Sequence, residues 1–107
     1  MFRNDEQLAA VCQALCALAG LPSLWTPAGP SERAKELLRT EGGPLSHGEK
    51  VMLYLAWSFW NGKGGLTVAE LVDTLDRSNL AAVGQLLQAH AEGPEALDAW
   101  LDDQSHP

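Results

Sequence analysis

The chain has 107 residues, of which 46% are hydrophobic, and a net charge of −7 from seven basic and fourteen acidic side chains. This length excludes two independent domains, because each half would have too small a core to be stable alone. The negative charge opposes binding to phosphate backbones and to anionic lipid, and no apolar run is long enough to span a bilayer. Leucine and alanine dominate while isoleucine is absent, which favours helices over strands.

The first predicted helix covers about residues 5–19, where apolar side chains recur at helical spacing. Asn4 is a suitable N-cap, and Gly20 suits a left-handed exit. Acidic residues in the first turn, and Gln13 within the apolar run, distinguish this segment from a signal peptide. We therefore expect a cytoplasmic protein.

Cys12 and Cys16 are the two cysteines, and they are separated by about one helical turn. This spacing places both thiols on one face of the helix, but a helix rarely offers the geometry that a disulfide needs. Two cysteines without a second pair of ligands are also a weak indication of a metal site. We expect free thiols in the core, kept in a reducing compartment.

Residues 20–30 contain three prolines and two glycines and are expected to form a connector. Leu24 and Trp25 within it are expected to fold back onto the core, because an exposed tryptophan in a loop is costly. Ser31 then caps a short, highly charged helix over about residues 32–40. We expect no strand anywhere in the chain.

Residues 51–60 read VMLYLAWSFW, in which only Ser58 is plainly polar. A capping box at Ser46 and Glu49 comes just before them, so we expect a helix over about residues 47–60. A helix that is apolar on all sides is normally buried on all sides, which makes this the central helix. If too few neighbours cover it, three aromatic side chains form an exposed patch that binds a partner: Tyr54, Trp57 and Trp60.

The glycine-rich segment NGKGG at residues 61–65 is expected to end this helix rather than to hold a phosphate group. A phosphate-binding P-loop follows a strand and has Ser or Thr directly after its lysine. Here a helix precedes the segment, and Gly64 follows Lys63.

Three further helices are predicted in the remainder of the chain. A second capping box, Thr67 with Glu70, opens a helix that continues to about residue 75. Asp76 or Ser78 caps the next helix, which stops near residue 93. Pro94 suits the first turn of the last helix. Residues 1–3 and 103–107 are expected to be frayed.

These elements predict an all-α fold, a compact single-domain bundle of five or six helices around the central helix at about 47–60. Residues 45–93, with "LTVAEL" opening the second of three helices, resemble the three-helix core of helix-turn-helix and winged-helix domains. The resemblance implies a tri-helical core and, as its usual function, DNA binding. Five polar side chains would then face the bases from the recognition helix: Ser78, Asn79, Gln85, Gln88 and His90.

The charge of this half of the chain opposes that function. Residues 66–107 hold eight acids and one base, Arg77, whereas phosphate neutralisation needs several bases. We therefore expect no nucleic-acid binding and treat the acids as a face for a basic protein partner. They are Glu70, Asp73, Asp76, Glu92, Glu95, Asp98, Asp102 and Asp103.

No catalytic, cofactor-binding or metal-binding pattern is apparent. Of the three histidines, His47 and His90 have no carboxylate or cysteine one helical turn away, and His106 lies in the tail that is expected to be frayed. We expect a small interaction or regulatory module that is not an enzyme and needs no cofactor. Two alternatives remain: a divergent helix-turn-helix DNA-binding regulator, and a structural homodimer built on exposed aromatics of the central helix.

Overall fold

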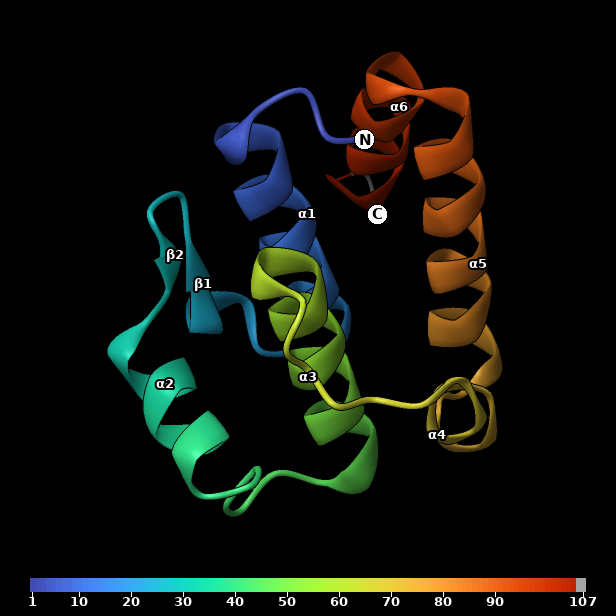
Figure 1. Cartoon of the computed structure of the whole chain (residues 1–107). Helices are drawn as coiled ribbons and strands as arrows, with labels where there is room; N and C mark the ends of the chain where they lie inside the picture. The colour runs from blue at the N-terminus through green and yellow to red at the C-terminus, as the bar shows by residue number, and fades with distance from the viewer. Residues whose placement is uncertain (106–107) are drawn as a thin grey trace.

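Six α-helices account for most of residues 1–105, which are the residues that the computed structural model describes (Figure 1). The helices are α1 (Asp5–Leu18), α2 (Glu32–Arg39), α3 (His47–Asn61), α4 (Val68–Thr74), α5 (Arg77–Glu92) and α6 (Pro94–Ser105). The radius of gyration of 12.8 Å is the value expected of a compact domain of this size. The predicted all-α bundle is confirmed.

Side-chain caps fix where five of these helices begin. In each case the cap accepts a hydrogen bond from the backbone N–H three residues later. The caps are Asn4, Ser31, Ser46, Thr67 and Asp76. Both predicted capping boxes form, and Asp76 rather than Ser78 caps α5, accepting from Asn79 N at 2.8 Å.

One short hairpin contradicts the expectation of no strand. After a single 3-10 turn (Pro22–Leu24), β1 (Trp25–Thr26) pairs antiparallel with β2 (Gly29–Pro30). Thr26 Oγ1 closes the turn by donating to Gly29 O at 2.9 Å and accepting from Ala28 N at 3.1 Å. Strands of two residues are too short to leave a pattern of alternation in the sequence.

The core forms where α1 packs against α3, the two helices at the centre of Figure 1. Val11, Leu15, Met52 and Ala56 are all buried there. Leu24 and Trp25 are buried as predicted, so the connector does fold back onto the core. The α5–α6 pair adds apolar side chains from its inner face to the same cluster.

The central helix is less completely covered than its sequence predicts. Its first half is buried from Val51 to Leu53, but Tyr54, Trp57 and Trp60 are each only partly buried. The expectation of burial on all sides is therefore wrong for the C-terminal half of α3. The two tryptophans lie toward short elements, Trp57 beside α2 and Trp60 against Trp25 of β1, and these elements cover them only in part.

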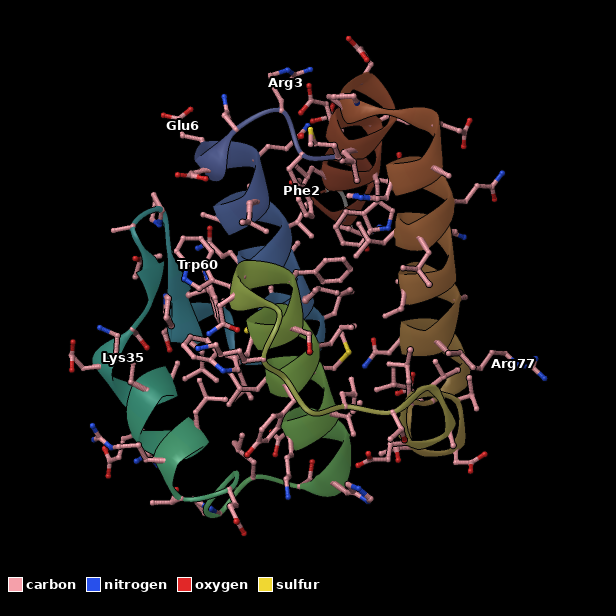
Figure 2. The ribbon with its side chains drawn as sticks, viewed as in Figure 1. Phe2, Arg3, Glu6, Lys35, Trp60 and Arg77 are labelled. Atoms are coloured by element: carbon pink, nitrogen blue, oxygen red, sulfur yellow. The ribbon has the colours of Figure 1, made fainter. Side chains whose placement is uncertain are left out.

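The N-terminal segment, which was expected to be frayed, packs between α3 and α5. The ring of Phe2 makes edge contacts with Phe59 of α3 and His90 of α5, with ring centroids 5.9 and 4.9 Å away (Figure 2). At the other end α6 continues through Ser105, whose hydroxyl donates to Leu101 O at 3.0 Å. The remainder of the predicted frayed tail, residues 106–107, lies outside the described residues.

Candidate functional site

The eight acids of the predicted partner face lie in two separate places. Glu70, Asp73 and Asp76 lie on α4 or in the turn that follows it, at the start of α5. The other five lie on the last turn of α5 or on α6: Glu92, Glu95, Asp98, Asp102 and Asp103. Figure 1 shows α4 at one end of α5 and the α5–α6 turn at the other. The acids therefore form two groups and not one continuous face.

Three of the eight acids already have partners within the chain. Glu70 Oε1 accepts from Thr67 N at 3.2 Å in the capping box, and Asp76 caps α5. Asp98 accepts from two side chains of the N-terminal segment. These hydrogen bonds leave the three carboxylates with fewer free acceptor sites for another molecule.

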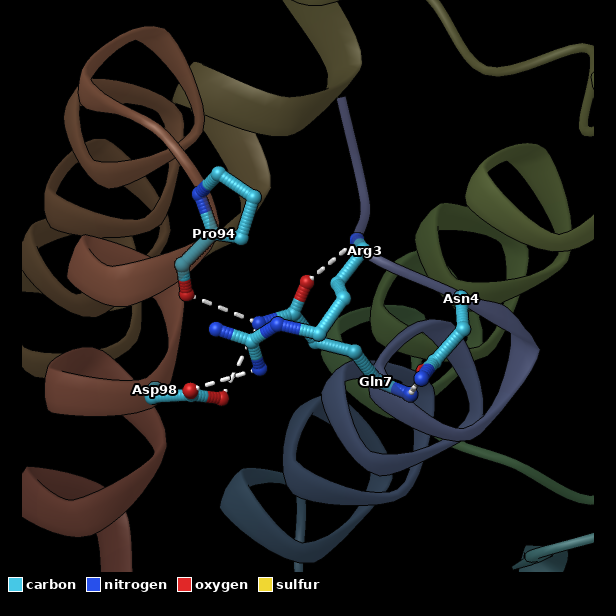
Figure 3. Close-up of polar contacts among 5 residues, drawn as sticks. All are labelled: Arg3, Asn4, Gln7, Pro94 and Asp98. Carbon is cyan, nitrogen blue, oxygen red and sulfur yellow. Dashed lines mark hydrogen bonds and ion pairs between the residues drawn. The ribbon is translucent and has the colours of Figure 1, made fainter.

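Asp98 is at the centre of a polar network that joins α6 to the start of the chain (Figure 3). Its Oδ2 accepts from Arg3 Nη1 at 2.7 Å, and its Oδ1 accepts from Gln7 Nε2 at 3.0 Å. Gln7 Nε2 also donates to Pro94 O at 2.8 Å. The hydrogen bond from Arg3, and after it the one from Gln7, lower the pKa of the Asp98 carboxyl.

A groove of about 310 Å³ runs between α5 and α6. Its floor consists of the buried Trp100 and Ala89, and Ala96 and Ala99 line it beside them. Trp100 is 4% exposed, and its indole N–H donates to Ala82 O at 3.0 Å, which fixes the ring between the helices. Small side chains on facing helices leave room for the groove.

Carboxylates and amides line the remainder of this groove. Glu92 and Asp103 contribute carboxylates, and Gln85 and Gln88 contribute amides. Neither carboxylate is in an ion pair with any of residues 1–105. The groove thus has an apolar floor with unpaired negative charge beside it.

The three aromatic side chains named from the sequence do not form one patch. Trp57 lines a hollow together with Lys35, Leu38 and Arg39 on the α2 side. Trp60 packs against Trp25, with ring centroids 5.9 Å apart. Tyr54 lies beneath the Lys50 ammonium, 5.7 Å from the ring centre.

Several residues of the α5–α6 groove were missed by sequence reasoning. The sequence indicates no site at Trp100, and it points to Gln85 and Gln88 only as contacts to bases. The alanines at positions 89, 96 and 99 were the available signal, since small residues on both sides of a Gly93–Pro94 turn allow two helices to approach closely.

Other kinds of site find little support in the part of the chain that the structure describes. No group of three or more His, Cys, Asp or Glu side chains within residues 1–105 is arranged to hold a metal ion. Burial raises the pKa of the Cys16 thiol to about 12 and raises that of Cys12 as well. Across the same residues, no helix has the length and apolar character needed to cross a membrane.

Comparison with family models, curated proteins and solved structures found no match to this chain.

Proposed function

We propose that the protein is a non-catalytic interaction module whose α5–α6 groove binds a lysine- or arginine-rich segment of a protein partner. The observation that supports this proposal is the pairing of an apolar floor at Trp100 with the unpaired carboxylates of Glu92 and Asp103. Long basic side chains match both features, because their aliphatic stems cover apolar surface while their charged ends reach carboxylates.

The charge around the groove favours a basic occupant over a nucleic acid. Glu95 and Asp102 are exposed on α6 and add to the negative potential. Arg77, the one base among residues 66–107, lies at the opposite end of α5 from Glu92. A phosphate backbone approaching this face would be repelled.

The first test uses a fluorescent peptide of alternating lysine and leucine, with a glutamate–leucine peptide of the same length as the control. Fluorescence anisotropy should show saturable, salt-sensitive binding of the lysine peptide only. The double variant Glu92→Lys with Asp103→Lys should weaken this binding by about tenfold or more, because it reverses both charges beside the groove.

A second double variant distinguishes binding in the groove from a general effect of net charge. Asp73→Lys with Glu6→Lys changes the net charge by the same amount, at two exposed carboxylates outside the groove. Weakening by the same factor in both double variants would contradict a site in the groove. Duplex DNA bound in a salt-sensitive manner would instead favour the helix-turn-helix alternative. Self-association that is insensitive to salt would favour the homodimer.

A further inference from the structure

A second hollow, of about 220 Å³, lies beside α3, between the loop after α2 and the segment that leads into α4. It shares no lining residue with the α5–α6 groove. The floor includes Val51 and Leu66, and the walls carry ionisable side chains of both signs. Its volume lies below the roughly 300–1,000 Å³ that holds drug-sized ligands, which restricts an occupant to about the size of an amino acid.

Two glycines hold the walls of this hollow against α3. A β-carbon on Gly64 would come within 2.6 Å of Tyr54 O, a backbone atom that cannot rotate away. A β-carbon on Gly42 would come within 2.8 Å of Lys50 Cδ. The loop at Gly64 therefore lies closer to α3 than any larger residue allows, whereas at Gly42 the constraint is weaker because the flexible Lys50 side chain can move.

The backbone at the rim is also in an unusual conformation. Glu41 has φ of 54°, and it is the one non-glycine residue with positive φ among residues 1–105. Left-handed backbone is strained for a residue with a side chain, and such strain is concentrated at ligand-binding sites. Here it sets the position of a carboxylate-bearing residue on the wall of the hollow.

The charged groups around the hollow are not neutralised by one another. Lys50 Nζ lies over the Tyr54 ring, and it forms no ion pair with any described carboxylate. Glu41 and His47 also form no ion pair within residues 1–105. Glu70 uses Oε1 in the capping box, while Oε2 accepts no hydrogen bond from the described residues.

We propose that this hollow binds a small zwitterion of the α-amino acid class. The ligand carboxylate pairs with Lys50 beside His47, and its ammonium group pairs with Glu41 and Glu70. An aliphatic side chain of the ligand covers Leu66, which is partly exposed beside the buried Val51. A ligand with one charge only would leave the carboxylates or the ammonium of the site without a partner.

The probe is free leucine, titrated into the isotopically labelled protein while amide resonances are followed by NMR. The amides of Gly64 and Gly65 should shift in a saturable manner below about 10 mM. Leucinamide lacks the carboxylate and 4-methylpentanoate lacks the amine, so each should bind at least about tenfold more weakly than leucine. Equal binding of leucine and 4-methylpentanoate would overturn the proposal.

Variants test the two charges separately. Lys50→Gln and Glu41→Gln should each weaken leucine binding by about tenfold or more, with the dispersion of the amide spectrum confirming that each variant is folded. Lys63→Gln is the control, since this lysine does not line the hollow and should leave affinity unchanged. The absence of saturable shifts with leucine, valine, methionine and phenylalanine would also overturn the proposal, and neither result bears on the groove between α5 and α6.

Discussion

Arg3 donates to the carboxylate of Asp98 at 2.7 Å, although the two residues are 95 positions apart in the sequence. Together with the bonds from Gln7 to Pro94 and Asp98, this pair attaches the start of α1 to the start of α6. The contact also places Phe2 against α3 and α5. The sequence predicts a frayed N-terminal segment, but this segment contacts α3, α5 and α6 and so connects the three helices.

This pair predicts a specific dependence of stability on pH. The folded-state pKa of Asp98 is below its usual value of 3.8, so the stabilisation is present above that value and is lost as the pH falls through the folded pKa. Arg3→Ala should lower the melting temperature at pH 7, and the gap from the parent protein should narrow in strong acid. Calorimetry of both proteins at a series of pH values from neutral to strongly acidic measures this gap.

The control for this prediction is Arg77→Ala. Arg77 is exposed and makes no ion pair with any of residues 1–105. Its removal should change the melting temperature little at either pH. An Arg3→Ala gap that stays constant down to pH 2 would show that the carboxylate of Asp98 is not the group responsible.

Substitution by alanine should change the free energy of unfolding in opposite directions at Gly64 and at Gly84. At Gly64 a methyl group would press on Tyr54 O, so Gly64→Ala should lower the free energy of unfolding by about 1–3 kcal/mol. At Gly84, within α5, no atom outside the helix lies close to the added carbon, so Gly84→Ala should raise it by about 0.5–1 kcal/mol. Urea denaturation measures both values, and a neutral Gly64→Ala would contradict the close contact of this loop with α3.

The tryptophans should differ in their importance for stability. Trp25 is 1% exposed and has Trp57 and Trp60 against its edges. Trp25→Ala should therefore cost about 3–5 kcal/mol. Trp60→Ala should cost less, because its ring is only partly buried. Chemical denaturation of the two variants gives the order directly, and a larger loss for Trp60 would place the centre of the aromatic cluster on α3 instead of on the connector.

Cys12 and Cys16 should be unreactive while the protein is folded. Both are fully buried, and Cys12 Sγ lies 3.3 Å from Ala56 O. Because the pKa of each thiol is raised, the stability that the protonated thiols contribute is fully present below the unfolded value near 9.0. It is lost as the pH rises through the folded values.

A thiol-specific dye measures this protection. No thiol should react at neutral pH in the folded protein, and both should react in denaturant. Ser78→Cys, at an exposed position on α5, is the positive control and should react at once. Rapid labelling of the parent protein without denaturant would show that α1 separates easily from α3.

The local sequence was sufficient to predict the helices and where they begin and end. Ser46 with Glu49, Thr67 with Glu70 and the cap at Asp76 each involve a side chain and a backbone group within three residues. The exit at Gly62, with φ of 75°, depends on that residue alone. Contacts of such short range can be predicted from adjacent residues, and this is why the helix boundaries and the all-α class followed from the sequence.

Features that depend on distant partners could not be predicted in the same way. The sequence placed Asp98 among eight free acids, but Arg3 and Gln7, at the other end of the chain, donate hydrogen bonds to its carboxylate. It also placed Tyr54, Trp57 and Trp60 on one helix without showing that Lys50 lies over Tyr54 while Trp25 packs against both tryptophans. Composition, charge and capping are properties of short segments and were determined by the sequence itself. The groove at Trp100, the hollow at Lys50 and the division of the acids depend on which helices pack together, and that packing arises only when the whole chain buries its apolar surface.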